Sequence, residues 1–418
     1  MPRLLRFPRL GRRPGRGAAG RVGAAILAAR GLLAPILAIT VTGLTLSMSF
    51  PLFALLLERA GASGTMIGLN SMAAPVAIVL GAPLMPLLLR QTGLAPLVMG
   101  AVALMGTVFA LLPLGEGMLW WTALRFVHGF AVTALFFAGE FWIVSAAPPT
   151  ARGRVIAVYS MALSGSFLLG PLILLVTGDA GTLPFYIGAA IVVSALVPLA
   201  WGAGAAPEPE PEAPPRLGDT LRFFRTDPAL LWAIVLFGAL EYGTLSLLSV
   251  WALRAGFETE IAVGLLALFA AGSLALQLPL GWAADRWEPR RLLALAAAVC
   301  LAAPLFLVAA APGSGSVGLG ALAVIGIAGL LWGGFGAGLY TISLAGLGGR
   351  YAGQRLAKAY AAVTLGYGIG ALFAPLGYGL AMDRVAPPHG LLLVTSATAG
   401  VYLALVLLRM ASARRESA

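Results

Sequence analysis

Residues 31–57, GLLAPILAITVTGLTLSMSFPLFALLL, form a long apolar stretch that contains no charged side chain. An α-helix rises about 1.5 Å per residue, so a stretch of this length can cross the roughly 30 Å of hydrocarbon in a bilayer. Its apolar character is continuous and does not alternate, which favours a transmembrane helix over a strand of a β-barrel. We therefore expect the first membrane span here.

Further stretches of similar length and apolar character follow along the chain. They lie near residues 65–89, 94–113, 118–142, 155–177, 183–202, 228–253, 261–283, 292–311, 317–345, 357–381 and 390–409. The segments between them are mostly short and carry charged or turn-forming residues, as in the sequence RQTG at 90–93. The sequence therefore predicts an all-α membrane protein with twelve transmembrane helices.

The overall composition agrees with a chain that lies mostly in lipid. Hydrophobic residues make up 60% and charged residues only 10% of the 418 positions, whereas a soluble domain averages about 25% charged residues. The single cysteine, Cys300, excludes an intramolecular disulfide. The chain contains no G-x-x-x-x-G-K-[ST] sequence for ATP-driven transport and no H-E-x-x-H zinc motif. We expect no cofactor, no bound metal and no enzymatic activity.

Basic residues gather on one side of the predicted helices. Of the 27 Lys and Arg residues, only Arg59, Arg254 and Arg384 fall in loops on the other side, and only Arg125 falls within a span. Because positively charged loops stay in the cytoplasm, we expect both termini there, in a bacterial inner (plasma) membrane. The net charge of +11 thus reflects topology and attraction to anionic lipid, and no nucleic-acid partner is expected.

A polar, proline-rich gap divides the chain near its middle. Its core, APEPEPEAPP at 206–215, favours an extended linker. Residues 217–225, which follow, are compatible with a short helix on the membrane surface. The predicted divisions are a cytoplasmic Arg-rich tail (1–30), an N-terminal six-helix bundle (31–202), a cytoplasmic linker (203–227), a C-terminal six-helix bundle (228–409) and a cytoplasmic tail (410–418).

The two halves resemble each other at a nearly constant offset. Residues 66–69 (MIGL) align with residues 262–265 (AVGL), and the same offset places Arg90 on Arg286. Matches of this kind are not expected between unrelated bundles. A unit with an even number of helices keeps its orientation when it is duplicated, so the pattern indicates a six-helix unit repeated in parallel.

The loop between the eighth and ninth spans carries a family resemblance. Its sequence, GWAADRWEPRR at 281–291, resembles the loop motif G-x-x-x-D-R-x-G-R-R of the major facilitator superfamily (MFS), and RFVHG at 125–129 is similar to the R-x-x-Q-G motif in the fourth span of that family. The resemblance implies two pseudo-symmetric six-helix bundles and transport by alternating access. It also implies that the first, fourth, seventh and tenth helices line a central cavity.

Ionisable residues inside the spans are the candidates for the mechanism, because a charge in the bilayer is costly and usually faces a cavity or a partner. Glu241 and Arg125 fall at similar depth in the seventh and fourth spans, with His128 one turn from Arg125. We expect Glu241 to be the proton-coupling site, while Arg125 stabilises its ionised form or binds an anionic group of the substrate. A permanent structural ion pair, or an Arg125 bonded to backbone carbonyls, is the alternative. His128 is either a further proton site or a hydrogen-bonded packing residue.

The family resemblance also implies a cytoplasmic gate around the loop motif. The candidate gate residues are Asp285, Arg286, Arg290, Glu140, Arg90 and Arg154. We expect Asp285 near the start of the fifth span, where Arg154 and the helix N-terminus favour an anion. Glu140 falls at the cytoplasmic end of the fourth span, and we expect it to pair with Arg90 or Arg152. A plain interfacial salt bridge is the alternative for Glu140.

Three residues of the first and tenth spans, Ser47, Trp332 and Tyr340, are expected to line the cavity, with helix packing as the alternative. Together these features predict a secondary active transporter of a small molecule that is coupled to protons and works as an exporter. An importer of sugars or organic anions is one alternative. A sensor or scaffold that keeps the transporter fold is another. We expect a monomer whose partners are its small-molecule substrate and membrane lipid.

Overall fold

The computed structural model describes residues 18–148, 152–178, 181–208, 217–311, 318–351 and 353–417. Within these ranges twelve helical segments are long and apolar enough to cross a membrane, and the predicted all-α fold with twelve transmembrane helices is confirmed. The helices are α1 (Ala18–Arg59), α2 (Gly64–Gly81), α3 (Met85–Thr92), α4 (Leu94–Leu111), α5 (Met118–Ala146), α6 (Arg152–Thr177), α7 (Leu183–Ser194), α8 (Leu196–Gly202), α9 (Leu217–Thr226), α10 (Pro228–Arg254), α11 (Thr259–Ala284), α12 (Pro289–Ala310), α13 (Leu319–Arg350), α14 (Gly353–Arg384) and α15 (Gly390–Ser417).

The helix ends depart from the predicted spans where local sequence favours it. α1 begins at Ala18, inside the predicted Arg-rich tail, because residues 18–29 are rich in alanine, the best helix former. Residues 1–17 of that tail lie outside the described part. The second span is made of α2 and α3, joined by the 3-10 turn Ala82–Leu84, in which Pro83 lacks the N–H that a continuous helix needs.

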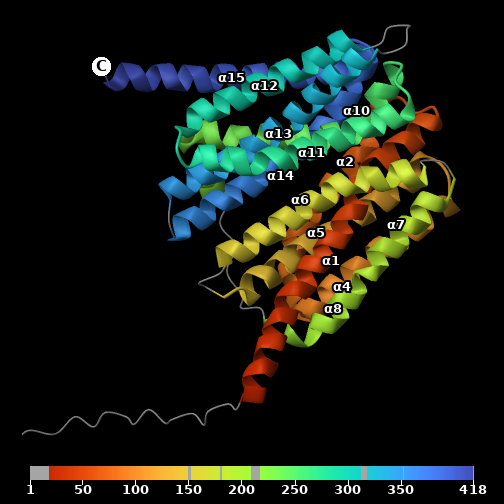
Figure 1. The fold of residues 1–418 in the computed structure, drawn as a ribbon, viewed down its shortest axis with the longest axis vertical. Helices are drawn as coiled ribbons and strands as arrows, with labels where there is room; N and C mark the ends of the chain where they lie inside the picture. The colour runs from red at the N-terminus through yellow and green to blue at the C-terminus, as the bar shows by residue number, and fades with distance from the viewer. Residues whose placement is uncertain are drawn as a thin grey trace, which may run out of the picture.

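The helices form two bundles that lie side by side (Figure 1). The N-terminal bundle, red to yellow-green, contains α1 to α8, and the C-terminal bundle, green to blue, contains α10 to α15. α9 lies between them in the sequence and packs on α10 and α14, with its Phe223 buried. Residues 209–216, most of the core of the predicted linker, lie outside the described part.

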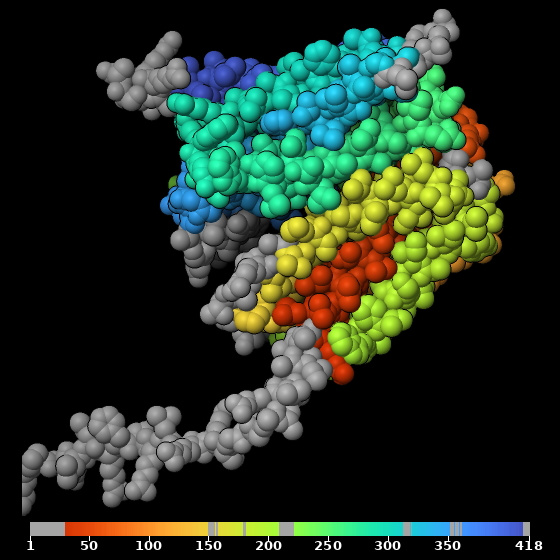
Figure 2. Space-filling view, in the orientation of Figure 1, coloured from red at the N-terminus to blue at the C-terminus, as the bar shows by residue number. Residues whose placement is uncertain are grey.

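The bundles are connected mainly by α2 with α14 and by α6 with α11, and also by α10, which contacts α1 and α2. α2 and α14 approach so closely that a Cβ at Gly68 would lie 2.3 Å from the carbonyl oxygen of Pro375, and one at Gly379 would lie 2.1 Å from that of Gly64. Glycine at these places allows the two backbones to touch. α6 and α11 run along each other in Figure 2, and with α13 they border an apolar groove of about 430 Å³.

The two ends of the bundles differ in charge. α1, α10 and α14 finish at one end, which we call the distal end, with Arg59, Arg254 and Arg384 as their last residues. We call the opposite end the basic end, because α3, α12, α13 and α15 place several arginines there, among them Arg90 and Arg290. The two ends are the places where gates between the bundles are expected.

Candidate functional site

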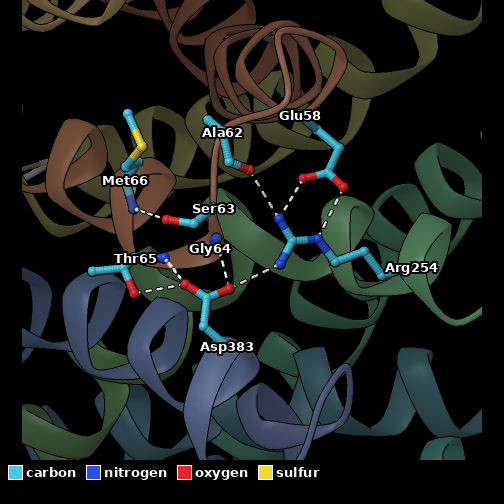
Figure 3. Close-up of polar contacts among 8 residues, drawn as sticks. All are labelled: Glu58, Ala62, Ser63, Gly64, Thr65, Met66, Arg254 and Asp383. Atoms are coloured by element: carbon cyan, nitrogen blue, oxygen red, sulfur yellow. Dashed lines mark hydrogen bonds and ion pairs between the residues drawn. The ribbon is translucent and has the colours of Figure 1, made fainter.

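An ion-pair network joins the two bundles at the distal end (Figure 3). The guanidinium of Arg254, at the end of α10, donates to the two carboxylate oxygens of Glu58 at 2.9 and 2.7 Å and to the carbonyl oxygen of Ala62 at 3.1 Å. It also pairs with Asp383 of α14 at 3.1 Å. Arg254 thereby connects the end of α1 to two helices of the C-terminal bundle.

Asp383 extends this network to α2. Its carboxylate accepts hydrogen bonds from the backbone N–H groups of Gly64 and Thr65 at 2.9 and 2.7 Å, and from the Thr65 hydroxyl at 2.6 Å. The first turn of a helix carries unpaired N–H groups and a partial positive charge, so it favours an anion. We call Glu58, Thr65, Arg254 and Asp383, with these contacts, the distal latch.

The distal latch is not among the features predicted from the sequence. In the sequence analysis, Arg254, Arg59 and Arg384 count only as the few basic residues in loops on the less positive side of the membrane. A further signal was available, because Glu58 and Asp383 stand at the ends of spans on a side with few other charges. Opposite charges confined to one small surface are expected to pair, although the sequence does not show which acid meets which base.

Arg125 is packed inside the protein, about 10 Å from the start of α5, and is only 3% exposed. Its Nη1 donates to the side-chain oxygen of Asn70 at 3.1 Å, and the Asn70 amide donates to the Thr122 hydroxyl at 3.0 Å. The guanidinium carbon lies 4.8 Å from the centre of the Phe53 ring, a cation–π contact. The hydroxyl of Tyr242 on α10 is also within electrostatic range of Arg125.

The expected contact between Arg125 and Glu241 is not formed. Glu241 instead accepts a hydrogen bond from the hydroxyl of Tyr367 on α14 at 2.9 Å. Neighbouring residues on a helix point about 100° apart, so the same helix turns Tyr242 toward Arg125 and Glu241 toward α14. Arg125 therefore connects α5 with α2 and approaches α10 at Tyr242, and its part in the mechanism stays a prediction.

His128 is buried in the N-terminal bundle. It is 2% exposed and packs edge-on against Phe109 of α4, with ring centres 5.7 Å apart. Its Nε2 atom has no hydrogen-bond partner within the described ranges. The hydrogen-bonded neighbour considered for His128 is therefore not found at this atom, and its role in proton transfer stays a prediction from a buried position.

Glu241 lies beside a cluster of aromatic rings. Phe237, one turn earlier on α10, contacts the rings of Tyr367 and Tyr340, with centres 5.7 and 5.2 Å away. Glu241 itself is half-buried. Tyr340, which the sequence placed on the cavity side of the tenth span, is therefore close to this acid.

Glu140 has a tyrosine partner of the same kind. The hydroxyl of Tyr159 on α6 donates to Glu140 Oε1 at 2.8 Å, and Glu140 is exposed. The expected pair with Arg90 is not formed, because Glu140 turns toward α6 while Arg90 is exposed on α3. The side chain of Arg152, the other expected partner, lies outside the described part.

Tyr340 of α13 is within electrostatic range of both glutamate–tyrosine pairs, at Tyr159 in the N-terminal bundle and at Tyr367 in the C-terminal bundle. At 1.5 Å per residue, Glu241 lies about 20 Å from the start of α10 and Glu140 about 9 Å from the end of α5. We call Glu140, Tyr159, Tyr340, Tyr367 and Glu241 the Glu–Tyr row. It runs from the middle of the bundles toward the basic end.

Two residues expected to line the cavity lie instead in helix packing. Ser47 is 1% exposed and donates to the carbonyl oxygens of Leu44 and Ser166 at 3.0 and 3.1 Å, where α1 packs on α6. Trp332 is completely buried and packs edge-on against Phe269 of α11, with ring centres 5.3 Å apart. The packing alternative holds for both, because the neighbouring helix covers the face on which each side chain lies.

The described side chains that were expected to form the gate at the basic end are not joined to one another. The Asp285 side chain is exposed and makes no hydrogen bond or ion pair with the side chains that the structure describes. The guanidinium of Arg286 folds back over Trp282 of its own helix, 4.1 Å from the ring centre. Arg290 lines a small cavity inside the C-terminal bundle, and the side chain of Arg154 lies outside the described part. The bundles are thus latched at the distal end, while the expected contact of Asp285 with Arg154 at the basic end involves a side chain outside the described part and stays a prediction.

The span interiors present acids rather than bases to an incoming molecule. Glu140 is exposed and Glu241 half-buried, whereas Arg125 and His128 are enclosed. The described residues contain no group of three His, Cys, Asp or Glu side chains that could hold a metal ion. Carboxylates and tyrosine hydroxyls next to aromatic rings suit protons and organic cations.

Comparison with known sequences agrees with this architecture. The model of the Major Facilitator Superfamily matches residues 36–375. The chain is 27% identical over 265 residues to the "Uncharacterized MFS-type transporter YfkF" of Bacillus subtilis (strain 168), a match that covers 62% of this chain and 67% of that protein.

Solved structures share the fold at low sequence identity. A bacterial homolog of the human lysosomal transporter Spinster, in an inward-facing and unoccupied conformation, has a TM-score of 0.70 at 15% identity over 91% of this chain and 95% of that one. The nucleoside transporter NupG has a TM-score of 0.70 at 10% identity over 91% of this chain and 98% of that one. With its twelve spans, its two bundles and a family match over most of its length, the chain belongs to the Major Facilitator Superfamily.

Proposed function

We propose that the chain is a secondary active transporter that exports an organic cation in exchange for protons. The observation that carries this proposal is the Glu–Tyr row, in which two carboxylates, one in each bundle, each accept a hydrogen bond from a tyrosine hydroxyl. The distal latch supports alternating access, because it closes one end of the contact between the bundles with groups that can separate. The chain has no ATP-binding motif, so an ion gradient is the expected source of energy.

The substrate class follows from the charges that remain available. Arg125 is only 3% exposed and donates to Asn70, so it is poorly accessible to an anionic substrate. Glu241 and Glu140 each have one hydrogen bond from a tyrosine and further acceptor capacity. The rings of Phe237 and Tyr340 beside Glu241 add faces that attract a cation. A molecule with a protonated amine or a quaternary centre and an apolar body fits these groups.

Exchange with protons follows from the cost of a bare charge in the membrane. An unpaired carboxylate inside the bilayer costs several kcal/mol, so Glu241 is expected to carry either a proton or the cation when the bundles rearrange. Proton and cation then compete for the same acid. When a proton from the outside binds this acid, the cation is released to the outside. Repeated cycles of this exchange export the cation.

Export also requires an orientation, and we propose that the basic end faces the cytoplasm of a bacterial plasma membrane. The uneven distribution of arginine supports this orientation. Single cysteines at Glu116, in a distal turn, and at Trp287, in a basic-end loop, test it in a Cys300→Ser background, since Cys300 is the only cysteine. In intact cells an impermeant maleimide should label Glu116→Cys, and it should label Trp287→Cys only after permeabilisation. The reverse pattern contradicts the orientation.

Transport itself is tested with the purified full chain in liposomes. Acid-loaded vesicles with the membrane potential clamped should take up ethidium or tetraphenylphosphonium, because protons leaving the vesicle drive the cation inward. Vesicles without a pH gradient, and vesicles without protein, provide the baseline. If the vesicles take up organic anions or sugars from a panel but neither cation, this result contradicts the proposed substrate class. The absence of any flux over cations, anions and sugars, with or without a pH gradient, supports a sensor or scaffold instead.

A further inference from the structure

A small basic cavity lies at the basic end of the C-terminal bundle, away from the Glu–Tyr row. Its volume is about 70 Å³. The starts of α10 and α12 and the ends of α13 and α15 meet around it. Its charged lining residues are Asp227, Arg290, Arg350 and Arg409. Three positive side chains therefore share the cavity with one negative side chain.

Asp227 neutralises only one of the three arginines. Its side chain is 4% exposed, and its carboxylate accepts from the guanidinium of Arg350 and from the hydroxyl of Tyr351. Within the described ranges, the guanidinium groups of Arg290 and Arg409 make neither a hydrogen bond nor an ion pair. The cavity thus has one arginine fixed by an acid and two arginines whose charges are unbalanced.

The backbone at the start of α10 adds donors to the same cavity. Pro228 occupies the first turn of α10, and the Asp227 side chain does not cap the helix. The first backbone hydrogen bond there joins Leu231 N–H to the Asp227 carbonyl. Ala229 and Leu230, in the first turn of α10, also line the cavity. The N–H groups of the first turn have no partner within their own helix, and such groups favour an anion.

The shape and the donors suit a phosphate group. A cavity of 70 Å³ has room for one tetrahedral oxyanion, since a single water occupies about 30 Å³ of liquid. Arginine binds phosphate oxygens through two parallel N–H donors, and two of the arginines are available here. We propose that the cavity binds the phosphate of an anionic phospholipid from the leaflet at the basic end.

The neighbouring surface favours a lipid over a free phosphate ion. Leu408, next to Arg409 on α15, is 71% exposed, and Leu295, five residues after Arg290 on α12, is 46% exposed. Trp232, one turn after Pro228, is 45% exposed, and tryptophan is common at the level of lipid headgroups. The helices that line the cavity therefore also carry exposed apolar side chains that can contact acyl chains. All the lining residues belong to α10, α12, α13, α15 and the end of α9, so the lipid is expected to stay bound when the bundles move apart.

Native mass spectrometry of the full chain in detergent tests the proposal, with dioleoylphosphatidylglycerol as the anionic probe and dioleoylphosphatidylethanolamine as the zwitterionic one. The Arg290→Gln/Arg409→Gln variant should bind phosphatidylglycerol about tenfold more weakly than the unchanged chain, because two arginines near the headgroup are lost. Arg409→Gln alone, an exposed position, should weaken binding by a smaller factor without disturbing folding. Binding of phosphatidylethanolamine should be weak in every case.

Arg291→Gln provides the matched control. Arg291 adjoins Arg290, but its side chain is 68% exposed and pairs with Glu288 at 3.2 Å, outside the cavity. This variant should bind phosphatidylglycerol as the unchanged chain does. Equal binding by the double variant, or equal loss in Arg291→Gln, overturns the site. Inorganic phosphate that displaces the lipid at an equal concentration shows a free-ion site and overturns the lipid assignment.

Discussion

Glu241 and Tyr367 form the residue pair on which the proposed coupling depends. Glu241→Gln keeps an oxygen that can accept the hydrogen bond from Tyr367, which now spans 2.9 Å, but glutamine cannot bind or release a proton. Proton-driven uptake of the cation into acid-loaded liposomes should therefore fall at least roughly tenfold, as expected for loss of an essential acid–base group. The melting temperature should stay within a few degrees, because the shape is preserved.

Glu116→Gln is the control for this variant, since it makes the same chemical change at an exposed position in a distal turn. It should transport like the unchanged chain. Uptake by Glu241→Gln that still follows the pH gradient assigns proton coupling to another group and removes Glu241 from the mechanism.

Arg125 should respond to mutation as a structural residue. Arg125→Met removes the donor to Asn70 and leaves a buried amide oxygen without its partner, which costs about 1–3 kcal/mol. We expect a melting temperature lower by several degrees in detergent and unchanged pH dependence of the transport that survives. A normal melting temperature with altered pH dependence would return Arg125 to the coupling role that its position in the sequence suggested.

The sequence identifies the two acids of the Glu–Tyr row but not their partners. Glu241 and Glu140 are identified as candidates because a carboxylate inside a membrane span costs free energy, so it usually faces a cavity or a partner. Their tyrosine partners are 126 and 19 residues away along the chain. Which face of a helix meets which neighbour depends on the packing of the whole bundle, and similar depth in two cavity-lining helices does not show that Arg125 and Glu241 meet.

At the scale of helices, the sequence is a reliable guide to the spans and a poor one to their contacts. The spans follow from apolar length, which is a local property, and the break at Ala82–Leu84 follows from proline. The contact between α2 and α14 has no such local signature. Gly68 and Gly264 occupy matching places in the repeat, yet only Gly68 meets another backbone.

This difference between equivalent glycines can be measured. Gly68→Ala puts a Cβ 2.3 Å from the carbonyl oxygen of Pro375, so α2 and α14 must move apart. We expect a loss of about 1–3 kcal/mol, typical of overpacking, and a clearly lower melting temperature. Gly264→Ala meets no atom within 4 Å and should be neutral or slightly stabilising, because alanine favours helix by up to about 1 kcal/mol over glycine. Equal effects of the two substitutions contradict the close contact between α2 and α14.

At the scale of the whole molecule, the repeat in the sequence predicts two equivalent halves, whereas the contacts between the halves are unequal. The distal end is closed by charged groups, while the Asp285 side chain at the basic end has no partner among the side chains that the structure describes. The same chain must adopt one arrangement that is closed at the distal end and another that is closed at the basic end. In a transporter of this kind the free energies of the two arrangements differ by only a few kcal/mol. The sequence therefore shows that gates exist, through residues such as Asp285, but not which gate is closed.

The distal latch should set the balance between these arrangements. Arg254→Gln removes two ion pairs whose side chains are 16–22% exposed. Partly exposed pairs contribute roughly 0.5–1 kcal/mol each, so the ratio of closed to open distal ends should fall about five- to thirtyfold. Spin labels at Glu116 and Glu260, exposed residues on opposite bundles at the distal end, should report longer distances in a Cys300→Ser background.

Arg384→Gln separates the latch from a general effect of charge at the same end. Arg384 directly follows Asp383, is exposed, and makes no hydrogen bond or ion pair within the described ranges. The Arg384→Gln variant should leave the distances between Glu116 and Glu260 unchanged.

Labels at Gln91 and Trp287, at the basic end, should come closer together in Arg254→Gln, because opening one end of two rocking bundles closes the other. Distal distances that lengthen without this change at the basic end indicate local fraying of α1 and α2, and they contradict a latch that governs alternating access.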